Sequence, residues 1–397
     1  MKKVIPADQV ALPGDLRRVN RQRILQVLRT GRTLTAADIH EETGISRPTV
    51  MRALQHFCEK GAVKSLGLGE TTRMGGKKPE LFVFSDTQKI LCVDLWPETI
   101  TLALCGMTGE VHDVADYAQP MDGRLRAAFD SLGEKAAEYL SQRGLRTDDL
   151  YGVVLTVPGT VDYETRLLRY NVKAPGWGSD VPLINELRRI FGEGREYFID
   201  NAGKAAGRAI LIEHPEYAQK RLMTFFTTWG VSACMMEKGH VLNGRDSLIG
   251  EIGHMIISDD GPVVCGCGKR GCLESLVSLR HVRSLMEDET LTFEALFQRS
   301  EAGDAAARRV VKYLAHCFAV VLHNLSLCYN QEIVVFQGDF ALADEWFDRC
   351  LKEELKQFRY YPDGALFTIS YDRRDLPVLA AQGGAELLRK QYFATLE

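Results

Sequence analysis

The chain has 397 residues, of which 45% are hydrophobic and 26% charged, and its net charge at pH 7 is −4. This composition is ordinary for a soluble globular protein of two or three domains. Ten cysteines scattered over so long a chain exclude a secreted disulfide scaffold.

The sequence offers no segment typical of membrane insertion or export. The N-terminus lacks an apolar signal core, and the longest apolar stretch, residues 310–329, contains Lys312, His316 and His323. We therefore expect a buried helix in that stretch, and a cytoplasmic protein that makes no membrane contact.

Charge is unevenly distributed along the chain. Residues 1–85 hold 15 Lys and Arg against 8 Asp and Glu, whereas the remainder holds 34 against 45. A basic N-terminal segment on an acidic body indicates that the segment meets a polyanion.

Three helices are predicted within this basic segment. Apolar side chains share one face of residues 19–28, and Thr35 with Asp38 marks the start of a second helix that ends near Gly44. A third helix begins after Ser46, giving the helix-turn-helix pattern. The N-terminal end of such a third helix meets base edges and phosphates. We therefore predict that it contacts double-stranded DNA through Ser46, Arg47, Thr49 and Arg52.

A two-stranded wing is predicted after these helices. Apolar and polar residues alternate around residues 63–66 and 81–83, and the intervening tip places glycines beside cations. Such a tip can follow a phosphate backbone or enter a minor groove, which assigns DNA contacts to Arg73, Lys77 and Lys78. A small helical adaptor with a solvated basic face is the alternative. The capped helices, the wing and the charge together favour a winged helix-turn-helix domain over residues 1–85.

The rest of the chain alternates between strands and helices. Strands are expected in these stretches: 89–95, 99–105, 109–111, 151–159, 223–226 and 332–338. A helix is expected at about 123–143, and the alternation predicts an α/β body of two lobes with a cleft between them. We expect a first lobe over 86–203, completed by a C-terminal helix over 377–397, and a second lobe over 204–376.

One imidazole and three thiols fall within a short segment of the second lobe. His254, Cys265, Cys267 and Cys272 suit a closed tetrahedral Zn²⁺ site with a structural role, because four protein ligands leave no open position. The intervening glycines let the backbone curl around one ion. A disulfide pair with one free cysteine is the alternative. Glu251 and Glu274 bracket the four residues.

This segment resembles the signature of the ROK family of repressors, open reading frames and kinases. The resemblance rests on Glu251-Ile252-Gly253-His254, Cys265-Gly266-Cys267-Gly268 and Cys272-Leu273-Glu274, supported by residues 157–162 and 383–385. With the helix-turn-helix it covers nearly the whole chain and points to regulators similar to the xylose and N-acetylglucosamine repressors. It implies an actin-like, ribonuclease-H-like ATPase-type body, with Zn²⁺ bound by the four residues.

The family also contains sugar kinases, but the phosphate-binding loops differ here. The first loop requires glycines whose N–H groups can approach phosphate, and here it reads Leu95-Trp96-Pro97-Glu98. The second loop, residues 228–234, holds one glycine, and the expected double glycine reads Gly338-Asp339. These changes disfavour nucleotide binding.

The catalytic base of these kinases is the Asp of an Asn-Asp pair, which accepts the proton of the sugar hydroxyl. Keeping Asn201 in register places Ala202 at that position, and a methyl group cannot accept a proton. A shifted register would place Asp200 there. Together with the altered loops, the first register predicts no catalytic residue and a protein that is not an enzyme.

The residues that the family uses for sugar binding are retained, and they map to Asn201, Glu251, His254 and Glu274. Paired carboxylates accept hydrogen bonds from neighbouring hydroxyls. In the alternative interpretation, the two glutamates hold the metal ligands in position and do not bind a sugar. Trp177 is either a stacking wall for a sugar or a core residue.

We therefore expect a sugar-responsive repressor that binds operator DNA as a homodimer or homotetramer and takes a small sugar or sugar phosphate as effector. A sugar kinase with an accessory head is one alternative. A module that docks a phosphotransferase protein is the other.

Overall fold

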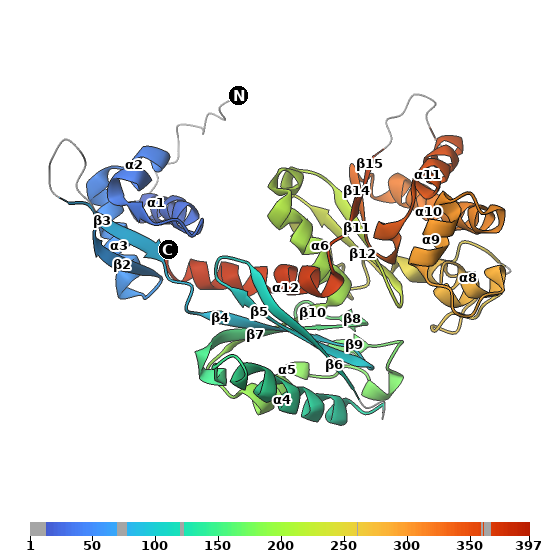
Figure 1. Ribbon diagram of the computed structural model, residues 1–397, viewed down its shortest axis with the longest axis horizontal. Coiled ribbons are helices and arrows are strands. Elements are labelled where there is room, and N and C mark those ends of the chain that lie inside the picture. The colour runs from blue at the N-terminus through green and yellow to red at the C-terminus, as the bar shows by residue number, and fades with distance from the viewer. Residues whose placement is uncertain (1–12, 70–77, 120–122, 260, 359, 361–366) are drawn as a thin grey trace.

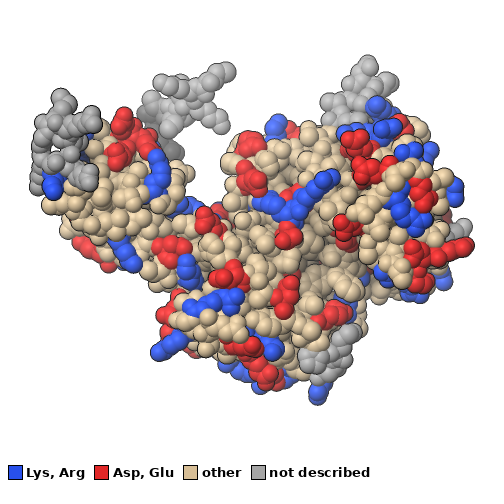
Figure 2. All heavy atoms as spheres, viewed as in Figure 1, with Lys and Arg blue, Asp and Glu red and all other residues tan. Residues whose placement is uncertain are grey.

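The computed structural model describes residues 13–69, 78–119, 123–259, 261–358, 360 and 367–397. The chain forms an N-terminal head and a body of two lobes. Figure 1 shows the head beside the C-terminus, at one end of the long helix α12. In the space-filling view the head projects from the body (Figure 2).

The head is a winged helix-turn-helix, as predicted. Its elements are α1 (Pro13–Leu28), β1 (Leu34–Thr35), α2 (Ala36–Thr43), α3 (Arg47–Glu59), β2 (Val63–Leu68) and β3 (Glu80–Phe84). The expected capping box starts α2, since Thr35 Oγ1 accepts from the Asp38 amide at 3.2 Å and Asp38 Oδ2 accepts from the Thr35 amide at 2.8 Å. Ser46 stands at the N-cap of α3 without a capping bond, because its hydroxyl pairs with that of Thr49 at 2.9 Å. Strand β1 joins the two predicted wing strands in the order β1-β3-β2.

The first lobe is built on a five-stranded sheet of order β10-β7-β4-β5-β6. Its elements are β4 (Lys89–Leu95), β5 (Thr99–Gly106), β6 (Val111–Ala118), α4 (Leu125–Ser141), β7 (Leu150–Val157), α5 (Leu183–Phe191) and β10 (Glu196–Asn201). Strands β4, β7 and β10 are parallel, and the antiparallel β5 and β6 extend one edge. A small hairpin, β8 (Thr160–Val161) with β9 (Leu168–Tyr170), follows β7.

The third strand expected at 109–111 is wrong in its bounds. Strand β6 begins at Val111 and runs to Ala118, because the residues before it form a turn. The Gly109 amide donates to Gly106 O at 3.1 Å, and the φ of Gly109 is +100°, a left-handed conformation that favours glycine.

The second lobe repeats the plan with a sheet of order β13-β12-β11-β14-β15. Its strands are β11 (Leu222–Thr227), β12 (Val231–Glu237), β13 (His240–Val241), β14 (Ile333–Gly338) and β15 (Thr368–Asp372). Its helices are α7 (Leu273–Leu276), α8 (Leu279–Met286), α9 (Phe293–Glu301), α10 (Ala305–Cys328) and α11 (Glu345–Gln357). Among the described residues, α10 is the one helix long and apolar enough to cross a membrane, but 56% of its most apolar window is buried inside the protein. It is the buried helix expected from the sequence: Phe318 packs on Phe225 and Phe336 of the sheet.

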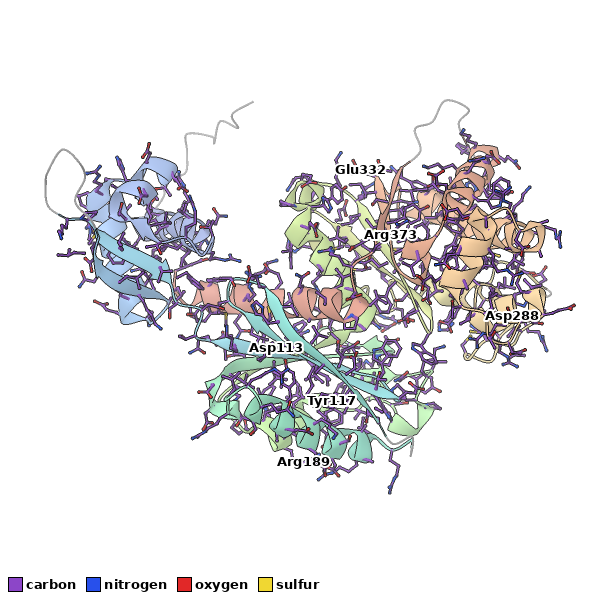
Figure 3. All side chains as sticks on the ribbon, viewed as in Figure 1. Asp113, Tyr117, Arg189, Asp288, Glu332 and Arg373 are labelled. Atoms are coloured by element: carbon purple, nitrogen blue, oxygen red, sulfur yellow. The ribbon has the colours of Figure 1, made fainter. Side chains whose placement is uncertain are left out.

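Two helices connect the lobes, α6 (Ala202–Glu213) and α12 (Leu376–Ala394), and α12 lies between the two sheets (Figure 1). They approach closely at Gly383, where a Cβ would lie 1.8 Å from Ala205 O. Side chains fill the spaces between each sheet and its helices, whereas the charged Arg189 and Asp288 lie at the periphery (Figure 3). A motion of α6 relative to the sheets must therefore also involve α12.

Candidate functional site

The four predicted metal ligands come together in the second lobe. One ligand atom from each of His254, Cys265, Cys267 and Cys272 lies within 4.8 Å of the other three. The sulfurs of Cys267 and Cys272 are 3.7 Å apart, and Cys265 Sγ is 3.4 Å from His254 Nδ1. A disulfide requires about 2.0 Å between sulfurs. A tetrahedron with metal–sulfur bonds of 2.3 Å has edges of about 3.8 Å. The cluster could therefore hold a metal ion.

Local backbone geometry places these ligands. Val264 and Arg270 form an antiparallel bridge, and the turn between them needs Gly268 at a φ of +83°. At Gly271 a Cβ would lie 1.7 Å from the Ser258 carbonyl oxygen, so a side chain there would push Cys272 out of place. The glycines between the thiols thus have a steric reason, as the sequence indicated.

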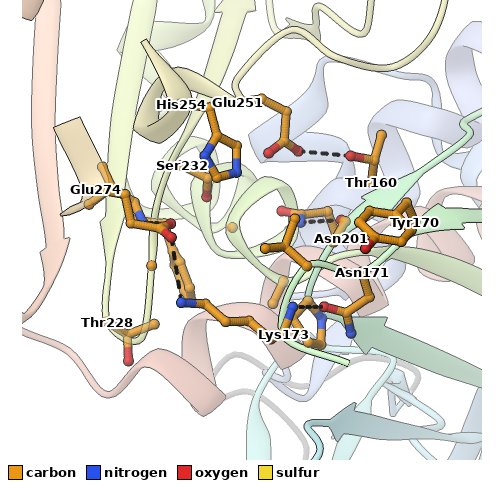
Figure 4. Close-up of a pocket in the computed structure, with 18 of the residues that line it drawn as sticks. Thr160, Tyr170, Asn171, Lys173, Asn201, Thr228, Ser232, Glu251, His254 and Glu274 are labelled. Atoms are coloured by element: carbon orange, nitrogen blue, oxygen red, sulfur yellow. Dashed lines mark hydrogen bonds and ion pairs between the residues drawn. The ribbon is translucent and has the colours of Figure 1, made fainter. Parts of the chain in front are cut away.

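A pocket of about 380 Å³ adjoins the cluster between the lobes. Asn201, Glu251, His254 and Glu274, the four residues predicted to bind a sugar, all line it. His254 lines the pocket (Figure 4) and is also one of the four cluster residues. The cluster therefore adjoins the pocket wall through a ligand side chain.

Both pocket glutamates accept hydrogen bonds. Glu251 Oε1 accepts from the Thr160 hydroxyl at 3.2 Å, and Glu274 Oε2 accepts from the Val231 amide at 3.0 Å. Lys173 Nζ lies 3.5 Å from Glu274 Oε1 and donates to Trp229 O at 2.6 Å. Figure 4 shows these side chains converging on the pocket from both lobes. The glutamates face the pocket, and each retains lone pairs for further donors.

Asn201 closes the pocket where β10 meets α6. Its Oδ1 accepts from the Lys204 amide at 3.1 Å and caps α6, and its Nδ2 donates to Gly159 O at 2.7 Å. Gly159, in the loop after β7, and the first turn of α6 together orient the Asn201 side chain.

The structure separates the two possible registers of the expected Asn-Asp pair. Ala202 lines the pocket. Asp200 is 3% exposed, lies outside the pocket lining and forms an ion pair with Arg208, which is also buried. Its second oxygen accepts from the Asn201 amide at 2.8 Å. A carboxylate so engaged is poorly placed to accept a proton from a pocket ligand.

A second cavity of about 540 Å³ adjoins the pocket across Lys173, Gly230 and Glu274. Asp339, which stands in the expected double glycine, lines this cavity, and burial raises its pKa to about 6. Near neutral pH Asp339 would carry a negative charge there, which opposes an incoming phosphate.

Some pocket residues were not identified from the sequence as ligand contacts: Thr160, Tyr170, Asn171, Lys173, Ser232 and the indole of Trp96. They come from the short strands β8 and β9, from β12 and from loops of both lobes, so only the fold brings them together. Trp177, which the sequence left open, is 4% exposed in the core of the first lobe, outside the pocket lining. It is a core residue.

In the head, the N-terminal end of α3 faces solvent. Ser46, Arg47 and Arg52 are exposed and Thr49 is half-buried, whereas Val50 on the opposite side is buried. Lys78 is exposed beside β3. Arg73 and Lys77 lie outside the described residues. The described part of the predicted DNA-contacting set is thus accessible to a partner.

Comparison with known proteins places both parts of the chain. The ROK family model matches residues 90–376, and the IclR helix-turn-helix model matches residues 22–67. A xylose repressor of Caldicellulosiruptor bescii is 25% identical over 86% of this chain and 88% of its own length. A glucokinase of Halalkalibacterium halodurans is 24% identical over 75% of this chain and 94% of its own. The crystal structure of a ROK family transcriptional regulator, a homologue of the E. coli MLC protein, superposes with a TM-score of 0.71 at 18% identity and covers 96% of this chain and 98% of its own. The fold of head and body is therefore shared over nearly the whole chain.

Proposed function

The chain belongs to the ROK family, and we propose that it is a sugar-responsive transcriptional repressor whose body binds its effector without phosphorylating it. The observation that carries the proposal is the combination of a winged helix-turn-helix with a pocket that keeps Asn201, Glu251, His254 and Glu274 but has Ala202 in place of a base. The similarity to a xylose repressor along both head and body supports it.

Three positions in and beside the pocket disfavour kinase activity. Ala202 cannot accept a proton, Asp200 is held by Arg208, and Trp96 occupies the pocket wall in the loop where the kinases of this family carry glycines. We therefore propose that the pocket binds a neutral or phosphorylated sugar through hydrogen bonds to its two carboxylates. The kinase alternative remains testable through ATP turnover.

We propose Zn²⁺ as the metal of the cluster, in a structural role. Three thiolates and an imidazole are the donor set that closed zinc sites use, and the sulfur separation fits tetrahedral bonds. An ion there would fix the loop that positions His254 and Glu274 against the pocket.

DNA binding is assigned to the head. Ser46, Arg47, Thr49 and Arg52 would enter the major groove, while Lys78, with Arg73 and Lys77 outside the described residues, would follow the backbone or enter the minor groove. We propose a homodimer or homotetramer in the cytoplasm, because two heads at a fixed spacing read two half-sites of an operator.

Gel-shift titration with DNA from upstream of its own gene tests the proposal. We expect retardation that a panel of hexoses, pentoses, amino sugars and their phosphates modulates. Glu274→Gln should keep DNA binding and lose the sugar response, whereas Arg52→Ala should weaken DNA binding and keep sugar binding in a thermal-shift assay. Failure to bind DNA at low salt would refute the regulator. ATP turnover abolished by Asp200→Ala would establish the kinase.

A further inference from the structure

A cavity of about 420 Å³ lies where the head meets the body, and it shares no lining residue with the effector pocket. Its walls come from the end of α1 in the head, the β5–β6 turn of the first lobe, α6 and α12. We call it the junction cavity, and its principal polar residues are Gln26, Arg29, Thr108, Arg208, Arg389 and Lys390.

Cations dominate this lining, and two of them are already neutralised. Arg208 pairs with the buried Asp200. Arg389, 3% exposed, lies 2.5 Å from Glu386, the one carboxylate in the lining, and donates to two carbonyl oxygens of the β5–β6 turn at 3.0 and 2.9 Å. These contacts fix the floor of the cavity and leave Arg29 without an ion pair among the described residues.

Arg29 and Lys390 leave the lining with an excess of positive charge, because the single carboxylate of Glu386 is shared between Arg389 and Lys390. Within the described part of the chain Arg29 forms no ion pair; its guanidinium stacks on Phe393, 4.1 Å from the ring centroid. Burial and the neighbouring Arg389 lower the pKa of Arg29, while the negative charge of Glu386 opposes this shift. Lys390 lies at the rim with 68% of its side chain exposed, 3.9 Å from Glu386.

We propose that the junction cavity binds a small phosphate-bearing anion through Arg29 and Lys390. The planar guanidinium matches the oxygens of a phosphate, and Lys390 adds a second charge. Gln26 and Thr108 offer neutral polar groups beside them. The volume lies within the range of about 300–1,000 Å³ typical of small-molecule sites. Inorganic phosphate and a phosphorylated sugar share this chemistry.

Isothermal titration calorimetry on the full-length protein without DNA tests the proposal. The probes are inorganic phosphate and glucose 6-phosphate, with glucose as the uncharged comparison. We expect at least one phosphate probe to bind, and Lys390→Glu to weaken that binding about tenfold or more, because the substitution removes a charged donor and places a carboxylate beside the phosphate. Arg29→Gln should do the same, but Lys390 is the safer position because it is exposed.

The matched control is Lys356→Glu, which changes net charge equally at an exposed lysine of α11 outside the cavity. It should leave binding unchanged. The proposal is overturned if neither phosphate binds, or if both charge reversals weaken binding equally. It also fails if glucose 6-phosphate binding is lost in Glu274→Gln and retained in Lys390→Glu, because the ligand then sits in the effector pocket. Binding of both probes identifies phosphate itself as sufficient, and binding of glucose 6-phosphate alone identifies the phosphorylated sugar.

An anion in this cavity would touch the head and α12 at once, so its binding would favour the head–body arrangement seen here. An effect of this anion on DNA affinity rests on the proposed function. The calorimetric test of the cavity is independent of that function, so a failure to bind DNA would not change its result.

Discussion

At the scale of single residues, the two pocket glutamates are each met by a group from the opposite lobe. The Thr160 hydroxyl bonds Glu251, and Lys173 lies beside Glu274. A sugar hydroxyl that takes either carboxylate competes with a contact between the lobes. We therefore expect effector binding at the proposed site to change the relative position of the lobes through these two contacts.

Asp94, at the end of β4, makes stability depend on pH. Burial raises its pKa to about 6, against hydrogen bonds from Thr156 at 2.7 Å and Trp96 at 2.8 Å that oppose the shift. Because the folded pKa exceeds the unfolded value of about 3.9, the protonated carboxyl favours folding below pH 4, and that contribution is lost as pH rises through 6. At pH 7.5 we expect Asp94→Asn to be more stable than wild type by about 1–2 kcal/mol and to melt at a higher temperature. This difference in stability should become smaller towards pH 5.

Differential scanning calorimetry at pH 5.0, 6.5 and 7.5 measures this gap. A gap that widens as the pH falls would contradict the assignment, because it would indicate a stabilising carboxylate at position 94.

At the scale of elements, the packing of α6 on α12 links the pocket to the C-terminal helix. Helix α6 starts at the pocket with the Asn201 cap, and α12 crosses it at Gly383. At Gly384 a Cβ would lie 2.6 Å from Val154 of the first sheet. The adjacent residues Gly383 and Gly384 thus allow α12 to pack closely against both α6 and the sheet of the first lobe.

The first prediction at this scale concerns that crossing. Gly383→Ala places a methyl 1.8 Å from a backbone oxygen, which cannot move aside as a side chain can, so we expect a loss of about 3 kcal/mol. Gly133→Ala in α4 is the matched control. Its methyl would meet Ile190 at 3.6 Å, an ordinary contact, and should stabilise the helix by about 0.5–1 kcal/mol. The urea midpoints of the two variants should shift in opposite directions from that of wild type. Equal shifts would contradict the close crossing of the two helices.

The segment of residues 254–272, which carries the four candidate metal ligands, also positions His254 and Glu274 at the pocket. Cys267→Ser should lower bound zinc and reduce sugar-induced thermal stabilisation together, because one loop serves both. Cys328→Ser, at an exposed cysteine outside the cluster, should change neither. Zinc content by atomic emission and a sugar thermal shift provide the two readouts. Full zinc and a full response in the Cys267 variant would show that the coupling is absent.

At the scale of the whole molecule, α12 is the structural link between head and body. Its C-terminal end lies in one apolar cluster with the buried residues of all three head helices. Beyond the helix, Leu396 O lies 3.2 Å from His56 Nε2, and Glu397 O accepts from Arg21 at 2.9 Å. The last residues of the chain are therefore part of the head.

Phe393 tests this link. It is 6% exposed, its ring centroid lies 5.9 Å from that of Phe84, and Arg29 stacks on it. Phe393→Ala should cost about 3–5 kcal/mol locally and speed hydrogen exchange in the head, while the lobe pocket keeps its sugar affinity. Phe393→Leu, which retains most of the apolar volume, should show a loss of stability and a rate of hydrogen exchange between those of wild type and Phe393→Ala. Uniform destabilisation of head and lobes would show that the head does not open separately.

The sequence predicted much of the candidate site because its signals are short-range. The four candidate metal ligands span only residues 254–272, with glycines where the backbone needs them, and Glu251 and Glu274 lie close beside them. The register at residues 200–202 was not decidable locally. It depended on Arg208, two helical turns away, which removes Asp200 from the pocket.

Local signals in the sequence were enough to predict the helix-turn-helix and the His–Cys cluster, since caps, apolar stripes and ligand spacing act over a few residues. The burial of Trp177 in the core, the positions of Trp96 and Lys173 at the pocket, and the packing of the end of α12 against the head follow only from the three-dimensional fold. The junction cavity joins residues as far apart as Arg29 and Lys390. Such contacts depend on which faces of distant elements meet, and that choice is made by packing the whole chain, which no local pattern records.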